Sequence, residues 1–140
     1  GIVFQIVNTL EKVVEEENAQ NIVKVLSYTN EVPELMSISD LVVTKPGGLT
    51  TTESLASGLP MILINPIPGQ EEENAEFLEN SGVAVWLKKD SNFDSIISEL
   101  LSNKNKLHQM KRNTKILAKK NSTRDICNII LKDKIIADVK

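Results

Sequence analysis

Cysteine, aromatic residues and long apolar runs are scarce in this sequence, and each scarcity excludes a class of protein. The single cysteine, Cys127, cannot form an internal disulfide, and no cysteine and histidine cluster has the spacing of a zinc site. Aromatic residues make up only 4% of the chain, too few for the stacking platform of a single-stranded nucleic-acid binder. Apolar runs such as residues 61–64 fall far short of the roughly 20 residues of a membrane-spanning helix, and no signal peptide is recognisable. We therefore expect a cytosolic globular domain that binds no nucleic acid.

Basic residues are scarce in the first part of the chain and acidic residues in the last, although the formal net charge is only −3. Residues 1–100 carry five lysines and arginines against sixteen aspartates and glutamates, whereas residues 101–140 carry eleven against three. The basic part could contact an anionic partner such as a membrane, or it could be a solvated helix face or a docking surface for another domain. The pattern alone favours the solvated or docking face.

Strand and helix patterns alternate along the chain. Apolar residues recur at helical spacing over residues 2–17, and short β-branched runs predict four buried strands. These strands are expected at residues 22–26, 41–44, 61–64 and 83–87. Further helices are expected from Pro33, over residues 50–57 and 71–81, and from near Phe93, Leu107 and Ile126. This order predicts an α/β fold, a Rossmann-like parallel sheet with helices on both faces.

The strongest motif is residues 44–53 (TKPGGLTTTE), a strand end that runs through two glycines into a helix. Glycines let a ligand approach the backbone closely, and the first-turn N–H groups of a helix have no internal partners. The backbone from Gly47 to Thr50 could therefore hold a phosphate or a diphosphate. The same arrangement also occurs in many α/β domains for topological reasons alone.

Glu53 has two interpretations. Thr50 and Glu53 have the spacing of a capping box, in which the Thr50 hydroxyl accepts from the Glu53 N–H and the Glu53 carboxylate turns back to the helix start. Alternatively, the carboxylate accepts two hydrogen bonds from the vicinal diol of a ribose beside the diphosphate. The pattern leaves both interpretations open.

A second candidate loop, residues 65–74 (NPIPGQEEEN), follows the third expected strand. Its two prolines and its glycine stiffen the backbone, which would help to aim Gln70 and Glu71 at sugar hydroxyls. The alternative is that the glutamates at positions 71–73 only favour a helix N-terminus through the helix dipole. Asn74 most simply faces the loop as a structural hydrogen-bonding group.

Other polar and aromatic residues give weaker signals. Tyr28 and Thr29 follow the first expected strand and could frame a base ring or form a solvent-facing turn. We expect His108 on the surface, Trp86 and Cys127 in the core, and residues 121–123 as a helix cap. The sequence contains neither the nucleophile elbow of a hydrolase nor a metal-binding cluster.

Several stretches together resemble one family of enzymes. They are residues 40–50 (DLVVTKPGGLT), Glu53, residues 58–62 (GLPMI) and residues 65–71 (NPIPGQE). They closely resemble the C-terminal half of the processive diacylglycerol glucosyltransferases and monogalactosyldiacylglycerol synthases. Peptidoglycan N-acetylglucosaminyltransferases are similar but more distant. The resemblance covers about residues 19–130.

The resemblance implies one half of a GT-B fold, in which residues 1–140 are the C-terminal, UDP-sugar-binding domain of a two-domain enzyme. The family's roles then fall on residues of the two motifs and of the turn after the first expected strand. The diphosphate would be held by Gly47, Gly48, Leu49 and Thr50, the ribose by Glu53, the sugar by Gln70 and Glu71, and the uracil by Tyr28 and Thr29, with Asn74 in the same donor site.

The implied reaction is inverting transfer of a hexose from UDP-glucose or UDP-galactose to diacylglycerol. It would need no metal or other cofactor, because the helix terminus stabilises the departing diphosphate. The catalytic base and the acceptor site would lie in an N-terminal domain, so this chain alone is expected to be inactive. The full-length protein would be peripheral on the inner face of a bacterial cell membrane. The alternatives are a peptidoglycan-type N-acetylglucosaminyltransferase domain, a noncatalytic nucleotide-binding module and a sugar-nucleotide epimerase.

The sequence departs from the family pattern in two places. It opens with Gly1 and a helix where the family has a strand and a glycine-rich loop, so we expect a domain truncated at its start. The family also has a further strand and helix before the strand expected at residues 22–26. We therefore expect one βα unit to be missing near residues 18–22, either through a genuine deletion or because the residues on the two sides of this point are not contiguous in the full protein.

Overall fold

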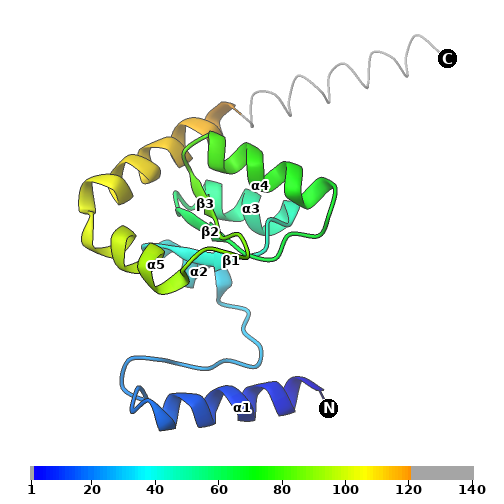
Figure 1. Cartoon of the computed structure of the whole chain (residues 1–140), viewed down its shortest axis with the longest axis vertical. Coiled ribbons are helices and arrows are strands. Elements are labelled where there is room, and N and C mark those ends of the chain that lie inside the picture. The colour runs from blue at the N-terminus through cyan, green and yellow to red at the C-terminus, as the bar shows by residue number, and fades with distance from the viewer. Residues whose placement is uncertain (1, 121–140) are drawn as a thin grey trace, which may run out of the picture. The chain divides into compact units, whose positions relative to one another are not determined.

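The described residues, 2–120 of a computed structural model, divide into two compact units (Figure 1). Within the described range, the first unit ends at Val32 and the second begins at Pro33. The helix expected near Ile126, the cap at residues 121–123 and the core position of Cys127 lie outside the described residues.

The first unit contains helix α1 (Ile2–Glu16), which confirms the helix expected there. Ile6, Leu10 and Val13 recur at intervals of three and four residues and therefore lie on one face of this helix. Each of these side chains is about half exposed.

The strand expected at residues 22–26 is wrong. Ala19 accepts hydrogen bonds from the N–H groups of Ile22 and Val23, which form a turn after α1, and the following residues have no regular structure. The Ile22 side chain is 86% exposed. A strand needs a neighbour to pair its backbone groups, and the described part of the first unit offers only α1 and turns.

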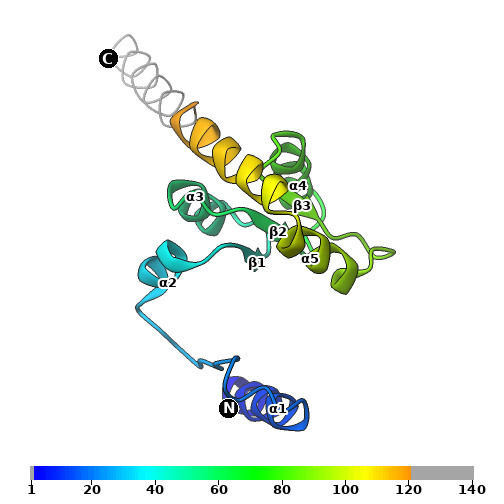
Figure 2. The same ribbon diagram turned by 90° about the vertical axis from the view of Figure 1, so that its left-hand side faces the viewer.

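The second unit alternates helices and strands, and its first helix, α2 (Val32–Ile38), begins at the boundary between the units. The other elements are β1 (Val42–Thr44), α3 (Gly48–Ala56), β2 (Met61–Leu63), α4 (Gln70–Asn80), β3 (Ala84–Trp86) and α5 (Phe93–Ser102). A further helix covers residues 104–120 and appears yellow to orange in Figure 2. Three of the four expected strands are therefore confirmed, each one or two residues shorter than expected.

The three strands form a parallel sheet in the order β1-β2-β3. Val42 lies opposite Met61, which in turn lies opposite Ala84, so the strands start and end in register. The central strand β2 is completely buried, as expected for a strand covered on both faces. This arrangement confirms the predicted α/β, Rossmann-like architecture.

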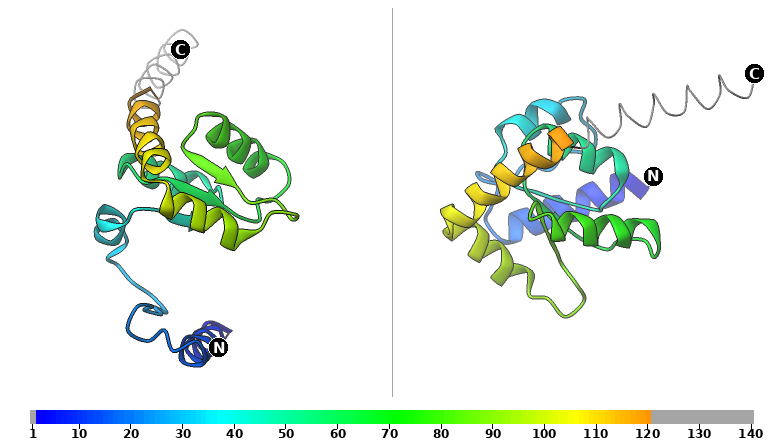
Figure 3. Two further views of the ribbon diagram at one scale, coloured as in Figure 1. Left: turned by 60° about the vertical axis from the view of Figure 1, so that its left-hand side comes forward. Right: turned by 90° about the horizontal axis from the view of Figure 1, so that it is seen from above.

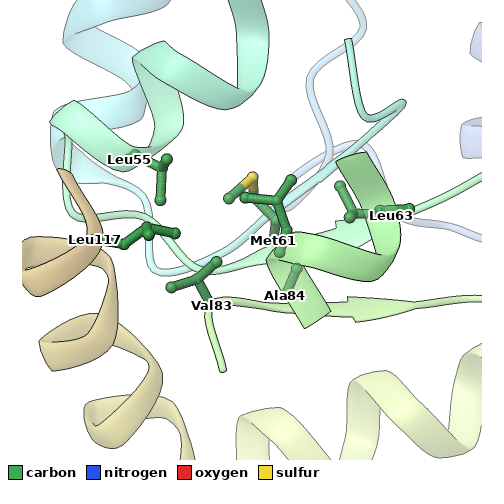
Figure 4. Close-up of a cluster of buried hydrophobic side chains, with 8 residues drawn as sticks. Leu55, Met61, Leu63, Val83, Ala84 and Leu117 are labelled. Atoms are coloured by element: carbon green, nitrogen blue, oxygen red, sulfur yellow. The ribbon is translucent and has the colours of Figure 1, made fainter. Parts of the chain in front are cut away.

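Helices cover both faces of the sheet, and a hydrophobic cluster lies on each face; the helix at residues 104–120 contributes to both, with Leu117 in the first and Met110 in the second. On one face, Met61 and Leu63 pack with Leu55 of α3 and Leu78 of α4 (Figure 4). On the other face, Ile62 packs with Leu100 of α5 and with Met110 of the helix at residues 104–120. Figure 3 shows α4 and α5 on opposite sides of the sheet.

The helix at residues 104–120 is tied to the amino-terminal end of the sheet. Lys111 Nζ lies 2.8 Å from Oδ1 of Asp40, which precedes β1, and Asn113 Nδ2 donates over 3.1 Å to the carbonyl of Gly82, which precedes β3. The opposite, carboxyl-terminal end of the sheet is therefore left to the loops that follow the strands.

The ion pair at this end predicts a measurable pH effect. The hydrogen bond from Lys111, and then its charge, lower the pKa of Asp40 below the ordinary aspartate value. Because the folded-state pKa is depressed, the stabilisation is present above the unfolded-state pKa and is lost as the pH falls through the folded-state pKa. We expect Lys111→Met to raise the titration midpoint of the Asp40 carboxyl carbon, measured by NMR, toward the ordinary aspartate value. Lys106→Gln, which breaks only the pair with Glu99, should leave that midpoint in place. An unchanged midpoint in Lys111→Met would contradict the pairing.

Candidate functional site

The loops that follow the three strands meet at one edge of the sheet, because the strands are parallel and in register. Open parallel sheets bind their ligands at this edge. Residues 45–47 lead from β1 into α3, residues 64–69 from β2 into α4, and residues 87–92 from β3 into α5. The first two loops and the helices that follow them carry all of the expected donor-site residues except Tyr28 and Thr29.

Tyr28 and Thr29 belong to the first unit and are not part of these loops. The Tyr28 side chain is 84% exposed, and Thr29 Oγ1 accepts a hydrogen bond from the N–H of Glu31 over 3.0 Å. This bond closes a local turn, in agreement with the solvent-facing turn that was one of the two interpretations of this segment.

The N-terminus of α3 presents its backbone donors without a side-chain cap. Gly47 is the N-cap residue, and its carbonyl accepts the first intrahelical bond, from Thr51. The N–H groups of residues 47–50 precede that bond and therefore have no acceptor within the helix. The hydroxyls of Thr51 and Thr52 donate backwards to the carbonyls of Gly47 and Gly48.

The capping-box interpretation of Thr50 and Glu53 is wrong. The N-cap residue is Gly47, three residues before Thr50, the N-cap that the box requires, so Thr50 lies inside the first turn. Gly47 has an ordinary extended backbone (φ −72°, ψ 146°), which lets the helix start immediately after it. The carbonyl of Thr50 then accepts from the Ser54 hydroxyl over 2.8 Å as an ordinary part of the helix.

The space above both glycines is open. A β-carbon added to Gly47 or Gly48 would meet no atom within 4 Å, and neither glycine has a positive φ. Neither packing nor backbone conformation therefore requires glycine here. A larger side chain at Gly47 or Gly48 would instead restrict the access of a ligand to the N–H groups of the helix start.

Glu53 stands one turn along α3 from this helix start. Its side chain is exposed, and Leu49 and Thr50, four and three residues earlier, are its neighbours on the helix surface. With the capping box excluded, the contact with a ribose is the interpretation of Glu53 that stays a prediction.

The loop between β2 and α4 is stiff and is closed by Glu71. Asn65 and Gly69 adopt positive φ values of 42° and 101°, and two prolines lie between them. Oε2 of Glu71 accepts a hydrogen bond from the N–H of Ile67 over 2.7 Å, so this carboxylate holds its own loop. Gln70 is exposed at the first position of α4. Glu71 therefore stabilises the loop that precedes α4, a structural role that its position in the sequence did not predict.

A groove of about 770 Å³ lies at the carboxyl ends of the strands. Val43, Ile64 and Phe93 contribute apolar surface, and Asn65 and Lys89 contribute polar groups. The loop after β3 holds none of the residues expected at the site from the sequence. The sequence signal that could have pointed to this loop is the change from the apolar run at residues 83–87 to the adjacent lysines at positions 88 and 89.

Trp86 also lines this groove. Trp86 was expected in the core, but it is only partly buried, against the first hydrophobic cluster. Lys88 Nζ lies 4.8 Å from the centre of its ring. A smaller groove of about 200 Å³ runs between α3 and α4 and is lined by Gly48, Thr52 and Asn74, among others.

Two other features of the described residues bear on the kind of site. Residues 2–120 contain no group of three or more histidine, cysteine, aspartate or glutamate side chains placed to hold a metal ion. Within the same range, each helix is too short or too polar to cross a lipid bilayer.

Comparison with known proteins gives a family and several named relatives. The family model described as "Glycosyl transferases group 1" matches residues 6–116. The processive diacylglycerol beta-glucosyltransferase of Bacillus subtilis (strain 168) is 43% identical over 119 residues, which cover 85% of this chain and 31% of that protein. The protein of the same name from Staphylococcus epidermidis is 42% identical over 111 residues, covering 78% of this chain and 28% of that protein.

The structural comparison agrees in fold. The crystal structure of the glycotransferase of kitacinnamycin aligns with a TM-score of 0.53 and 21% identity, and the alignment covers 76% of this chain and 29% of that one. At this identity the likeness concerns the fold alone. Among the curated relatives, the matched region is about three tenths of each protein's length, so this chain spans about three tenths of the relatives that it matches.

Proposed function

The chain belongs to the group 1 glycosyl transferases, and we propose that it is the donor-binding half of a GT-B enzyme that transfers a hexose from a UDP-sugar to diacylglycerol. The observation that carries this proposal is the uncapped N-terminus of α3 behind two unobstructed glycines, at the carboxyl edge of a parallel sheet. The names of the relatives supply the acceptor class.

The diphosphate is proposed to bind the backbone N–H groups of residues 47–50. These donors and the positive end of the α3 dipole favour an anion, and they favour it more as negative charge develops on the departing diphosphate. Lys45, exposed just before the glycines, adds positive charge at the same edge. This chain would therefore supply leaving-group stabilisation for inverting transfer.

The ribose and the sugar are proposed to lie on either side of the diphosphate. Glu53, one turn into α3, would accept from the ribose hydroxyls, and Gln70 at the start of α4 would donate to or accept from the sugar. Glu71 would fix the loop through Ile67 and offer its second oxygen to the sugar. Tyr28 and Thr29 remain our proposal for the uracil.

The acceptor side is proposed to come from outside this chain. Diacylglycerol is a membrane lipid, so the full-length protein would work as a peripheral protein at the inner face of a bacterial cell membrane. The catalytic base would lie in the other domain of the enzyme, across the cleft from the donor.

A nucleotide series tests the donor-site proposal. By calorimetry, the 140-residue chain should bind UDP at least about tenfold more tightly than UMP, because the second phosphate adds charge-assisted hydrogen bonds of about 1.5–3 kcal/mol each to the helix start. ADP should bind more weakly than UDP if the base is recognised. Equal affinities for UDP and UMP would contradict a diphosphate site at α3.

A further inference from the structure

Two helices reach the ends of the sheet through an asparagine side chain. At the carboxyl end, Asn74 Nδ2 on α4 donates over 3.2 Å to the carbonyl of Pro46, in the loop that leads into α3. At the amino end, Asn113 Nδ2 donates over 3.1 Å to the carbonyl of Gly82. The two bonds have the same chemistry and nearly the same length, but only the first one reaches the candidate donor site.

The carbonyl that Asn74 contacts belongs to a peptide unit of the candidate diphosphate site. In the Pro46–Gly47 peptide, the Pro46 oxygen and the Gly47 N–H are fixed in one plane and point in opposite directions. A bond that holds the oxygen toward α4 therefore directs the Gly47 N–H away from α4. The same bond polarises the peptide and makes its N–H a stronger donor.

Helix α4 is a firm support for this contact. Ala75 and Leu78 on α4 are 0% and 4% exposed and pack in the core against the sheet. Pro46 itself is fully buried and has no N–H with which to hold its own position by a backbone bond. The first turn of α4 carries Gln70 and Glu71, so one helix holds both the sugar loop and the diphosphate loop.

We propose that Asn74 is a positioning residue, which orients the Gly47 N–H toward the diphosphate and holds the diphosphate and sugar loops in register, without itself contacting the diphosphate. This inference rests on the proposed donor site. The role agrees with the structural hydrogen-bonding group that the residues alone indicated for Asn74, and it differs from the resemblance, which grouped Asn74 with the residues that bind the UDP-sugar.

The test replaces each asparagine by leucine, which keeps the approximate shape and removes the donor. In Asn74→Leu, the affinity for UDP should fall roughly five- to tenfold, the range of one lost hydrogen bond, while the affinity for uridine stays unchanged. Without ligand, the ¹⁵N order parameter of Gly47 should fall from the rigid value of about 0.85 toward about 0.6. Asn113→Leu is the matched control and should lower thermal stability comparably, with no change at Gly47 or in UDP affinity.

Three results would overturn the positioning role. The first is an unchanged order parameter of Gly47 in Asn74→Leu together with weaker UDP binding, which would mean that Asn74 contacts the ligand directly. The second is an equal loss of UDP and uridine affinity, and the third is the same effect on UDP in Asn113→Leu. If the unmodified chain binds no UDP while Gly47 still loosens in Asn74→Leu, the proposed function fails and the orientation of Gly47 by Asn74 stands.

Discussion

Gly48→Val should abolish UDP binding, with an affinity at least a hundredfold lower, and leave the fold intact. The added β-carbon meets no protein atom within 4 Å, so the protein gains no internal clash. Valine instead places two methyl groups over the helix start that the diphosphate must approach, and a ligand pushed out of reach loses several charge-assisted hydrogen bonds of about 1.5–3 kcal/mol each. Calorimetry with UDP measures the loss.

Thermal unfolding monitors the fold in the same variant. Glycine and valine differ by less than about 1 kcal/mol in helix propensity, so the free energy of unfolding should change little. Ser95→Val, which introduces valine into the exposed first turn of α5, is the matched control and should bind UDP normally. UDP affinity in Gly48→Val equal to that of the unmodified chain would show that the diphosphate binds elsewhere.

Glu53→Gln is expected to weaken UDP binding about tenfold or more without affecting stability. The amide keeps the shape of the carboxylate but loses the charge that strengthens two hydrogen bonds from the ribose diol, each worth about 1.5–3 kcal/mol at most. Because the helix starts at Gly48, the glutamate side chain is not part of a capping box whose loss would lower stability.

The control for this variant is Glu76→Gln, which removes the same charge from an exposed position on α4. It should change neither UDP affinity nor the melting temperature. If Glu53→Gln melts several degrees lower and binds UDP normally, the carboxylate supports the helix rather than the ribose.

Local sequence patterns predicted most of the second unit. The strands β1, β2 and β3 are continuous apolar or β-branched runs, and the helices between them end where Gly58 and Gly82 adopt φ values of 67° and 71°. Such signals are local, so they can be recognised without knowing the rest of the fold.

The segment at residues 22–26 has the same apolar, β-branched character but forms no strand, because pairing depends on a neighbouring strand that local sequence cannot supply. In the family, a strand and helix precede this segment. That one βα unit is missing near residues 18–22 stays a prediction.

Within the site, the residue types and their loops could be predicted, but the hydrogen bonds of individual side chains could not. The start of α3 was placed two residues late because Thr50 and Glu53 have the spacing of a capping box, whereas the helix had already begun at Gly48. The bond of Glu71 to the Ile67 N–H depends on how the proline-rich loop folds back on α4. The contact of Asn74 with Pro46 joins positions 28 residues apart and needs the packing of α4 on the sheet.

The most direct measurement of the central claim is a UDP titration of the ¹⁵N-labelled chain, followed through its backbone amide signals. A diphosphate at the start of α3 should shift the amides of residues 47–50 most, since their N–H groups would bind its oxygens. Gly58 and Gly82, at the amino end of the sheet, should hardly move. Largest shifts at that end, or at the helix of residues 104–120, would contradict the donor site that we propose.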